Sequence, residues 1–559
     1  MSKAYSKPAV WMKMVSLSLA VTLVLAGCSG GGGKSSTNAA GSSSSAAPAA
    51  SAEQSSAPAQ GGELSYALAT SPDQLDPHRS GLAVAVRVIR TLYDTLVVQL
   101  PGGEIKPWLA TEWSISEDGK SYTFKLRQDV KFQDGTPFNA EAVKYNFDRI
   151  IDPETKAANA LALVRPYESS EVIDEYTVKL NLSEPSQAFL GNVSQALLSI
   201  VSPTAAKKDG DQFTKHPVGT GPFKFVKWDE NSEIVVEKNP DYKWAPETVG
   251  QQGAPNLDKI IFKIVPEEAT RIGSVQSGQV LAAETVPPQN ILSLKNDANS
   301  QLYQANTVGL PYTLFINQSR APWNELKARQ ALQLGINVEA IVKTLYLGTY
   351  EQAWSPLSPG IFGYDASLEG SVKPDIEKAK QLLDELGWKA GADGIREKDG
   401  KKLTLHYVDG SPNREKRNDI AAIVQQLKPL GIQVDVEITK DVATVVYANN
   451  NYDLYGNSQV NSDPNALYSI YHTTAPGARQ NLPNLSDPEL DKLLEDGATE
   501  QDQTKREAIY KEAQQLIINK AVIIPIYVFP YTVAASKKVQ GLAFDSLGYP
   551  IFNDVYIAE

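Results

Sequence analysis

The sequence predicts an α/β fold that includes parallel strands. Apolar residues alternate over 403–407, recur at helical spacing over 414–428, and alternate again over 432–438. This strand–helix–strand order is typical of two parallel strands joined by a crossover helix. Because a chain of 559 residues is too long for one ordinary core, we expect two or three lobes.

Residues 1–28 have the pattern of a lipoprotein signal peptide. Three lysines and an apolar run over 15–26 precede a Leu-Ala-Gly-Cys sequence that ends at Cys28. The apolar run is shorter than the roughly 20 residues that a transmembrane helix needs. We therefore expect cleavage before Cys28 and acylation of this cysteine, with palmitate or a similar chain as the membrane anchor.

Residues 29–61 are rich in Gly, Ser, Ala, Pro and Gln. Such a segment cannot bury enough apolar surface to offset the entropy that ordering would cost. We predict a disordered, flexible tether between the membrane and a folded body that begins near Gly62.

The composition excludes several kinds of chemistry. A net charge of −12 makes the chain a poor binder of nucleic acids. The only cysteine is Cys28, so the mature body can form no disulfide and has no thiol nucleophile or thiolate metal ligand. Neither a His-Glu-x-x-His nor a Gly-x-Ser-x-Gly pattern occurs. We expect no metal site, no cofactor and no enzymatic activity.

Strand and helix patterns alternate through the first half of the folded body. The predicted strands are 63–69, 122–126 and 176–182. Helical spacing predicts a helix over 87–96 and a second one that begins after Asn139, a favourable N-cap residue. An Asp-Gly pair at 118–119 predicts a hairpin turn before the second strand.

A phosphate-binding loop is one interpretation of the segment that contains Gly219, Gly221 and Pro222. The third glycine of such a loop and the helix cap that follows it are both missing. We instead predict a tight crossover where the chain re-enters the first lobe.

The second half repeats the mixture of helices and strands. Residues 328–360 predict two helices, the second capped by Asn337, and then a loop stiffened by two prolines. Further predicted elements are a helix over 376–386 that Gly387 ends, helices over 487–496 and 502–518, and a buried strand over 521–528.

Several long motifs stand in a fixed order along this body. Pro-Val-Gly-Thr-Gly-Pro-Phe-Lys-Phe occupies 217–225, and Ser-Pro-Leu-Ser-Pro-Gly occupies 355–360. The other motifs lie at 93–97, 107–113, 122–127, 132–143, 329–332, 452–456 and 462–467. Together they resemble family 5 of the extracellular solute-binding proteins, the dipeptide-, oligopeptide- and nickel-binding components of ABC importers.

The resemblance implies a type 2 periplasmic-binding-protein fold of the large three-domain form, with two lobes joined by a hinge. The implied domain I comprises 62–102, 217–305 and 523–559, domain II comprises 103–216, and domain III comprises 306–522. Chain crossings near 305–310 and 519–524 would form the hinge.

The resemblance also places the ligand beside the loop 456–465. In peptide-binding members this loop carries an aspartate that pairs with the α-ammonium group of the ligand. In dipeptide binders a tryptophan and that aspartate correspond to Asn457 and Val460, so neither is matched here. For Asp463, a turn before Pro464 and a ligand contact both stay open.

The candidate ligand-binding residues are mostly neutral hydrogen-bonding or aromatic groups. They are Tyr312, Asn317, Trp354, Asn457, Gln459, Asn461, Asp463 and His472. Such a set suits a longer peptide that is read through its backbone, or a sugar.

In function, the resemblance implies a monomeric, lipid-anchored receptor on the outer face of the cytoplasmic membrane, in an extracellular or periplasmic position. It would capture a solute, foremost a peptide, and deliver it by hinge closure to ABC permease subunits that work with a cytoplasmic ATPase. Two alternatives stay open. The same fold could carry an oligosaccharide or another non-peptide solute, or the protein could be a surface sensor or chaperone without a transporter.

Overall fold

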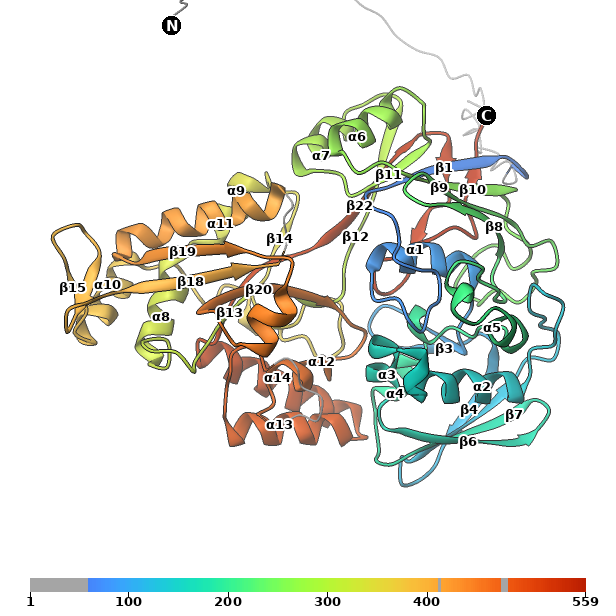
Figure 1. The fold of residues 1–559 in the computed structure, drawn as a ribbon, viewed down its shortest axis with the longest axis horizontal. Coiled ribbons are helices and arrows are strands. Elements are labelled where there is room, and N and C mark those ends of the chain that lie inside the picture. The colour runs from blue at the N-terminus through green and yellow to red at the C-terminus, as the bar shows by residue number, and fades with distance from the viewer. Residues whose placement is uncertain (1–58, 411–413, 474–480) are drawn as a thin grey trace, which may run out of the picture. The chain divides into compact units, whose positions relative to one another are not determined.

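The computed structural model describes residues 59–410, 414–473 and 481–559, with the backbone alone over 414–417 (Figure 1). The predicted signal peptide, the lipidation site Cys28 and nearly all of the tether lie outside these residues. Helices and strands are mixed along the described chain, in agreement with the α/β prediction. Among the described residues, no helix combines the length and apolar character that crossing a membrane requires.

A seven-stranded sheet forms the centre of the first lobe, which comprises residues 59–306 and 530–559 (Figure 1). In sheet order its strands are β12 (Ser300–Asn306), β22 (Pro530–Ser536), β11 (Ala282–Glu284), β1 (Glu63–Leu68), β10 (Lys259–Ile264), β9 (Glu233–Lys238) and β8 (Phe223–Asp229). The central strand β1 runs parallel to β10 and β11, and the other neighbours are antiparallel. Helix α1 (Ala83–Leu92) buries Val88, Ile89 and Leu92 in the core of this sheet.

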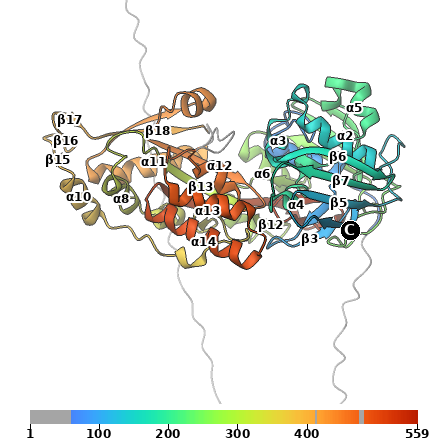
Figure 2. The same cartoon turned by 90° about the horizontal axis from the view of Figure 1, so that it is seen from below.

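A four-stranded antiparallel sheet belongs to the same lobe. Its strands, in order, are β4 (Ala110–Ile115), β5 (Ser121–Leu126), β7 (Thr177–Leu182) and β6 (Tyr167–Asp174). Helix α2 (Ala140–Ile151) packs on β6 and β7 (Figure 2), and at its start the Asn139 side chain accepts a 3.0 Å hydrogen bond from the Ala142 N–H. The predicted hairpin, strands and helix cap of this region are confirmed.

Shorter elements complete the first lobe. They are β2 (Val97–Gln99), β3 (Ile105–Pro107), α3 (Ala158–Val164), α4 (Phe189–Asn192), α5 (Pro203–Asp209), α6 (Glu268–Gln276), α7 (Pro288–Leu294), β23 (Val539–Gln540), β24 (Ala543–Phe544), β25 (Pro550–Ile551) and β26 (Tyr556–Ile557).

The helix predicted over 87–96 instead runs over Ala83–Leu92, because the chain after it is held by another contact. Tyr93 is already extended, and the next residue, Asp94, is completely buried. The Asp94 carboxylate accepts hydrogen bonds of 2.9 Å from Trp244 Nε1 and from Thr220 Oγ1. Hydrogen bonds from residues far along the sequence therefore hold Asp94 in a non-helical position. The spacing of apolar residues cannot reveal such contacts.

Burial raises the pKa of Asp94 to about 7, although its three donors and nearby Arg90 oppose the rise. Between about pH 4 and pH 7 the native state then keeps a proton that the unfolded chain releases, so this residue lowers stability as the pH rises through that window. We predict that Asp94→Asn, relative to the parent protein, gains stability steadily from about pH 4 to pH 7 and no further above it. Urea unfolding at several pH values measures this difference, and parallel stability curves would contradict it.

The glycine-rich segment at 219–222 lies against the C-terminal end of α1. The Gly221 N–H donates a 2.9 Å hydrogen bond to the Leu92 carbonyl. The side chain of Gln133 joins the two segments, because its Nε2 atom donates to the carbonyls of Leu92, Gly221 and Phe223 at 3.2, 3.2 and 2.7 Å. The two backbone segments therefore lie in close contact immediately before β8, and a re-entry of the chain into a first domain at this point stays a prediction.

A six-stranded sheet forms the centre of the second lobe, residues 309–528. In sheet order its strands are β14 (Glu351–Gln352), β21 (Ile523–Val528), β13 (Gly309–Ile316), β20 (Leu454–Val460), β18 (Thr404–Asp409) and β19 (Gln433–Ile438). Helix α11 (Arg414–Leu427) connects β18 to β19, which run parallel as predicted (Figure 1). Because β19 is an edge strand, its apolar residues Val436 and Ile438 stay 43% and 42% exposed.

The remaining elements of the second lobe lie around this sheet. They are α8 (Leu326–Gly335), α9 (Val338–Leu345), α10 (Ile376–Glu385), β15 (Lys389–Ala390), β16 (Arg396–Lys398), β17 (Lys401–Lys402), α12 (Ala466–Tyr471), α13 (Pro488–Thr499) and α14 (Gln503–Asn519). The predicted cap of α9 is confirmed, since Asn337 Oδ1 accepts a 2.9 Å hydrogen bond from the Ala340 N–H. The proline-containing loop after α9 packs on β13, where Ser358 and Gly309 exchange hydrogen bonds of 2.8 and 2.9 Å.

The chain crosses between the two large sheets twice, at neighbouring positions (Figure 1). Residues 307–308 connect β12 to β13, and Phe529 connects β21 to β22. The backbone N–H and the hydroxyl of Thr307 both donate to the Phe529 carbonyl, each at 2.9 Å. The first crossing lies where it was expected. The second lies at Phe529 rather than at 519–524, because β21 pairs with β13 in the second sheet.

Candidate ligand-binding site

The loop 456–465 starts within β20 and contacts the first chain crossing just after that strand ends. Strand β20 pairs antiparallel with β13, so that Gly309 lies opposite Val460 and Leu310 lies opposite Gln459. Beyond the strand, the Asn461 N–H donates a 3.0 Å hydrogen bond to the Val308 carbonyl in the crossing. The structure therefore places the predicted ligand loop at the junction of the two lobes.

Asn457 and Gln459 alternate along β20 and so share one face of the sheet. Their partners across the strand pair are Thr313 and Leu310, and Leu310 belongs to the core cluster around α12, α13 and α14. Both side chains, and that of Asn461 after them, are half-buried. Asn457 and Gln459 thus lie on one side of β20, and the role of all three amides as ligand contacts stays a prediction.

Tyr312 lies on the opposite face of the same sheet, in the other core cluster. Its ring stacks on Tyr527 at a centroid distance of 5.0 Å, and its hydroxyl donates a 2.8 Å hydrogen bond to Asp409 Oδ2. Burial raises the pKa of Tyr312 well above its usual range, and nearby Tyr407 and Asp409 add to the effect. A Cβ atom at Gly456 would come within 2.2 Å of the Tyr312 hydroxyl. Tyr312 is therefore packed directly beneath the loop.

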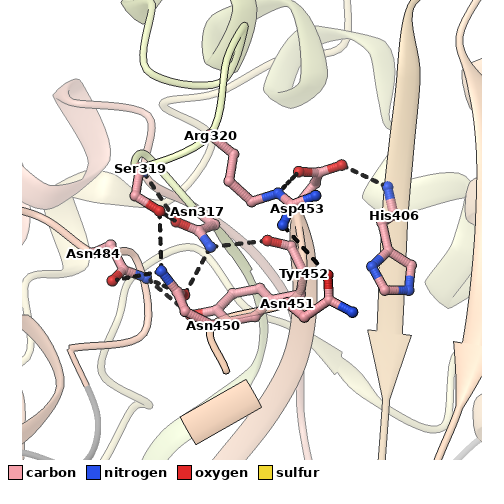
Figure 3. Close-up of polar contacts among 9 residues, drawn as sticks. All are labelled: Asn317, Ser319, Arg320, His406, Asn450, Asn451, Tyr452, Asp453 and Asn484. Atoms are coloured by element: carbon pink, nitrogen blue, oxygen red, sulfur yellow. Dashed lines mark hydrogen bonds and ion pairs between the residues drawn. The ribbon is translucent and has the colours of Figure 1, made fainter. Parts of the chain in front are cut away.

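Asn317 belongs to a polar network at the end of β13 (Figure 3). Its Nδ2 atom donates 2.9 Å hydrogen bonds to Asn450 Oδ1 and to the Tyr452 carbonyl, while its Oδ1 accepts from Ser319. Close by, Arg320 pairs with Asp453 at 2.6 Å. Asn317 thus helps to position the start of β20. Its side chain does not lie next to Asn457 or Gln459.

Asp463 forms a buried ion pair with Arg506 of α14. The guanidinium donates two hydrogen bonds to the carboxylate, of 2.6 and 3.0 Å, and Asp463 Oδ1 also accepts from the Asn465 N–H at 2.8 Å. Burial lowers the pKa of Arg506, but the adjacent Asp463 outweighs this effect and holds the pKa above its ordinary value. The carboxylate therefore holds the turn before Pro464 against α14.

The contacts of Trp354 and His472 involve other residues than the amides of the loop 456–465. Trp354 follows β14, is half-buried, and precedes the loop that packs on Gly309. His472 caps the C-terminal end of α12, where its ring stacks on Tyr468 at 4.4 Å and its Nε2 lies 3.1 Å from Glu495. His472 therefore joins α12 to α13, and its role in ligand binding, like that of Trp354, stays a prediction.

Residues of the first lobe that the sequence did not single out reach the same loop. Gln195 Nε2 donates a 2.9 Å hydrogen bond to Ser462 Oγ, and Gln99 Nε2 approaches the Ser462 carbonyl at 3.5 Å. Elsewhere between the lobes, the Gln187 N–H points at the Ala498 carbonyl at 3.4 Å. No pattern in the sequence marks the two glutamines, because each lies hundreds of positions from Ser462.

A small cavity of about 40 Å³ adjoins Gln99 within the first lobe. Trp108 and the ion pair between Arg90 and Asp545, 2.9 Å apart, contribute to its lining. The space suits a few water molecules rather than a solute. For metal ions, the described part of the chain contains no group of three or more His, Cys, Asp or Glu side chains that could hold one.

Comparisons with known proteins give a consistent result. Residues 104–481 match the family described as "Bacterial extracellular solute-binding proteins, family 5 Middle". The glutathione-binding protein GsiB of Escherichia coli O1:K1 is 29% identical over 501 residues, which cover 86% of this chain and 91% of GsiB.

Two solved structures resemble the described chain closely. The first, DppA from Helicobacter pylori in complex with the peptide STSA, aligns with a TM-score of 0.75 and 26% identity over 90% of this chain and 99% of DppA. The second, NikA from Brucella suis in complex with Fe(III)-EDTA, aligns with a TM-score of 0.79 and 24% identity over 89% of this chain and 100% of NikA.

Proposed function

Because the chain belongs to family 5 of the bacterial extracellular solute-binding proteins, we propose that it captures a peptide between its two lobes and delivers it to an ABC importer. The family relationship and the periplasmic-binding-protein fold expected from the sequence motifs are both confirmed. The chain is accordingly a binding protein and not an enzyme.

The observation that supports this function most directly is the pair of adjacent crossings. Two lobes whose backbones connect through residues 307–308 and 529 can rotate about that short connection while each sheet stays intact. Since the loop 456–465 lies beside this connection, a ligand held by the loop would bridge the lobes and favour the closed form.

The loop chemistry favours a ligand read through its peptide backbone. The amide side chains of Asn457, Gln459 and Asn461 each carry donor and acceptor atoms, the kinds of group that an extended peptide requires, although Asn461 Oδ1 already accepts a 3.2 Å hydrogen bond from the Asp463 N–H. Asp463, the one carboxylate in this loop, is occupied by Arg506 and so supports the loop instead of an α-ammonium group. Peptide binding is further supported by relatives that bind glutathione and the peptide STSA.

A second candidate is a non-peptide solute. NikA, which has the same fold, was solved with Fe(III)-EDTA, so this architecture also accepts a metal chelate. An oligosaccharide would use the same neutral amides together with Trp354. A surface sensor or chaperone without a transporter is the remaining alternative.

Location and partners form part of the proposal. We place the protein outside the cytoplasmic membrane, anchored through acylated Cys28 and the tether over 29–61, as a monomer. Its partners would be permease subunits of an importer and, through them, a cytoplasmic ATPase. Metabolic labelling with a palmitate analogue would test the anchor, since labelling must disappear in a Cys28→Ala variant.

The function can be tested on the purified full-length protein by native mass spectrometry followed by titration. We expect the protein to retain peptides from the cell, and its tryptophan fluorescence to change saturably with a peptide mixture. Asn457→Ala should weaken that response about five- to tenfold, through loss of hydrogen bonds to the ligand. The exposed Ser458→Ala on the neighbouring position is the matched control. A response to oligosaccharides or metal chelates but none to peptides would overturn the peptide assignment.

A further inference from the structure

Ser462 is held in place on both sides by contacts within or beside the second lobe. Before it, the Asn461 N–H is bonded to the Val308 carbonyl in the chain crossing. After it, Asp463 is clamped by the two hydrogen bonds from Arg506. The hydroxyl of Ser462 thus extends from a segment that contacts on both sides hold in position.

The partner of this hydroxyl belongs to the other lobe. Gln195 lies after α4, and its Nε2 donates to Ser462 Oγ at 2.9 Å, with a second hydrogen bond of 3.2 Å to Asn192 Oδ1. Ser462 and Gln195 are only 5% and 7% exposed. The contact is therefore a direct, buried hydrogen bond between the lobes, and it requires no ligand atom.

A buried polar contact of this kind is sensitive to the loss of either partner. When the lobes separate, water can solvate both side chains. When they close, each side chain must find its partner or remain unsatisfied. Removing the Ser462 hydroxyl would leave one donor of the Gln195 amide buried without an acceptor, so it penalises the closed form alone.

We propose that Ser462 and Gln195 form a closure latch, which sets the balance between the open and closed forms of the receptor before any solute binds. This proposal depends on the proposed function in one respect, which is that the two lobes move relative to each other. Because the latch residue lies in the same loop as Asn457, Gln459 and Asn461, closing the latch brings the first lobe against the loop that carries these amides. Apparent affinity then scales with the fraction of protein that can close.

The latch can be tested without knowledge of the solute. The full-length chain has a single cysteine, so a Cys28→Ser background allows nitroxide labels at Glu117→Cys on the first lobe and Lys505→Cys on the second, both exposed positions. Electron–electron distance measurements on solute-free protein report the proportions of closed and open forms. We expect Ser462→Ala to lower the closed-to-open ratio about tenfold.

Three further variants make the result specific. Ser462→Thr keeps the hydroxyl and should restore the parent distribution. Ser469→Ala removes a hydroxyl that donates to the Ala466 carbonyl within α12 and should change nothing. Gln195→Ala should open the protein as Ser462→Ala does, and the double variant should add little to either. An unchanged distribution in Ser462→Ala, or additive effects in the double variant, would overturn the latch, whether or not the protein binds peptides.

Discussion

Replacing Arg506 with Met should lower the free energy of unfolding by about 3–5 kcal/mol. The substitution leaves Asp463 buried near the end of the loop 456–465 without the cation that donates two hydrogen bonds to it. It also removes the 2.9 Å hydrogen bond from Arg506 Nε to the Gly497 carbonyl in α13. Urea unfolding followed by circular dichroism measures the loss.

Two controls distinguish the effect of losing the ion pair from the effect of replacing a long side chain. Lys505→Met, on the exposed neighbour, should change stability by no more than about 0.5 kcal/mol. Adding Asp463→Asn to Arg506→Met removes the unpaired charge and should recover a large part of the loss. If Arg506→Met cost less than about 1 kcal/mol, the pair would not be what holds the loop.

Replacing Gly221 with Ala should destabilise the first lobe by at least about 3 kcal/mol and reduce the yield of folded protein. An added Cβ atom would lie 2.4 Å from the carbonyl carbon of Leu92 and 2.6 Å from the nitrogen of Tyr93. Both are backbone atoms, so no rotamer change can relieve the overlap. Moving the segments apart would break the Gly221–Leu92 hydrogen bond and the contacts of Gln133.

The helix α6 offers a matched glycine for comparison. Gly273 has ordinary helical geometry, and a Cβ atom there would meet nothing within 4 Å. Gly273→Ala should therefore stabilise the protein by about 0.5–1 kcal/mol, because alanine loses less backbone entropy in a helix. Thermal unfolding of the two variants side by side distinguishes steric overlap from a general effect of adding a methyl group. Equal effects would contradict the close approach at Gly221.

The sequence predicts those elements of the fold that depend on residues close together in the chain. The Asn139 and Asn337 caps depend on residues three positions away, and the parallel pair β18 and β19 depends on alternation with a helix between. The second crossing could not be located in this way. The chain is apolar and buried on both sides of Phe529, so the sequence pattern does not change where the strand leaves one sheet for the other.

The candidate site shows the same limit more strongly. The motif around Asp463 indicates the loop, but Arg506, the cation that pairs with this carboxylate, lies 43 positions away. Ser462 meets Gln195 and Gln99 at separations of 267 and 363 positions. The resemblance places Tyr312 and Gln459 in one candidate set, but the register of β13 and β20 puts them on opposite faces of one sheet.

The adjacency of the two crossings also has an evolutionary consequence. The Thr307 N–H donates to the Phe529 carbonyl. The chain therefore leaves the first lobe before residue 309 and returns to it after residue 528 at almost the same point, as it does around an inserted module. Recombination between relatives at these two positions would transfer the loop amides together with Arg506. Gln195 and Gln99 would come from the recipient, so the contacts at Ser462 would form between side chains of two different parents.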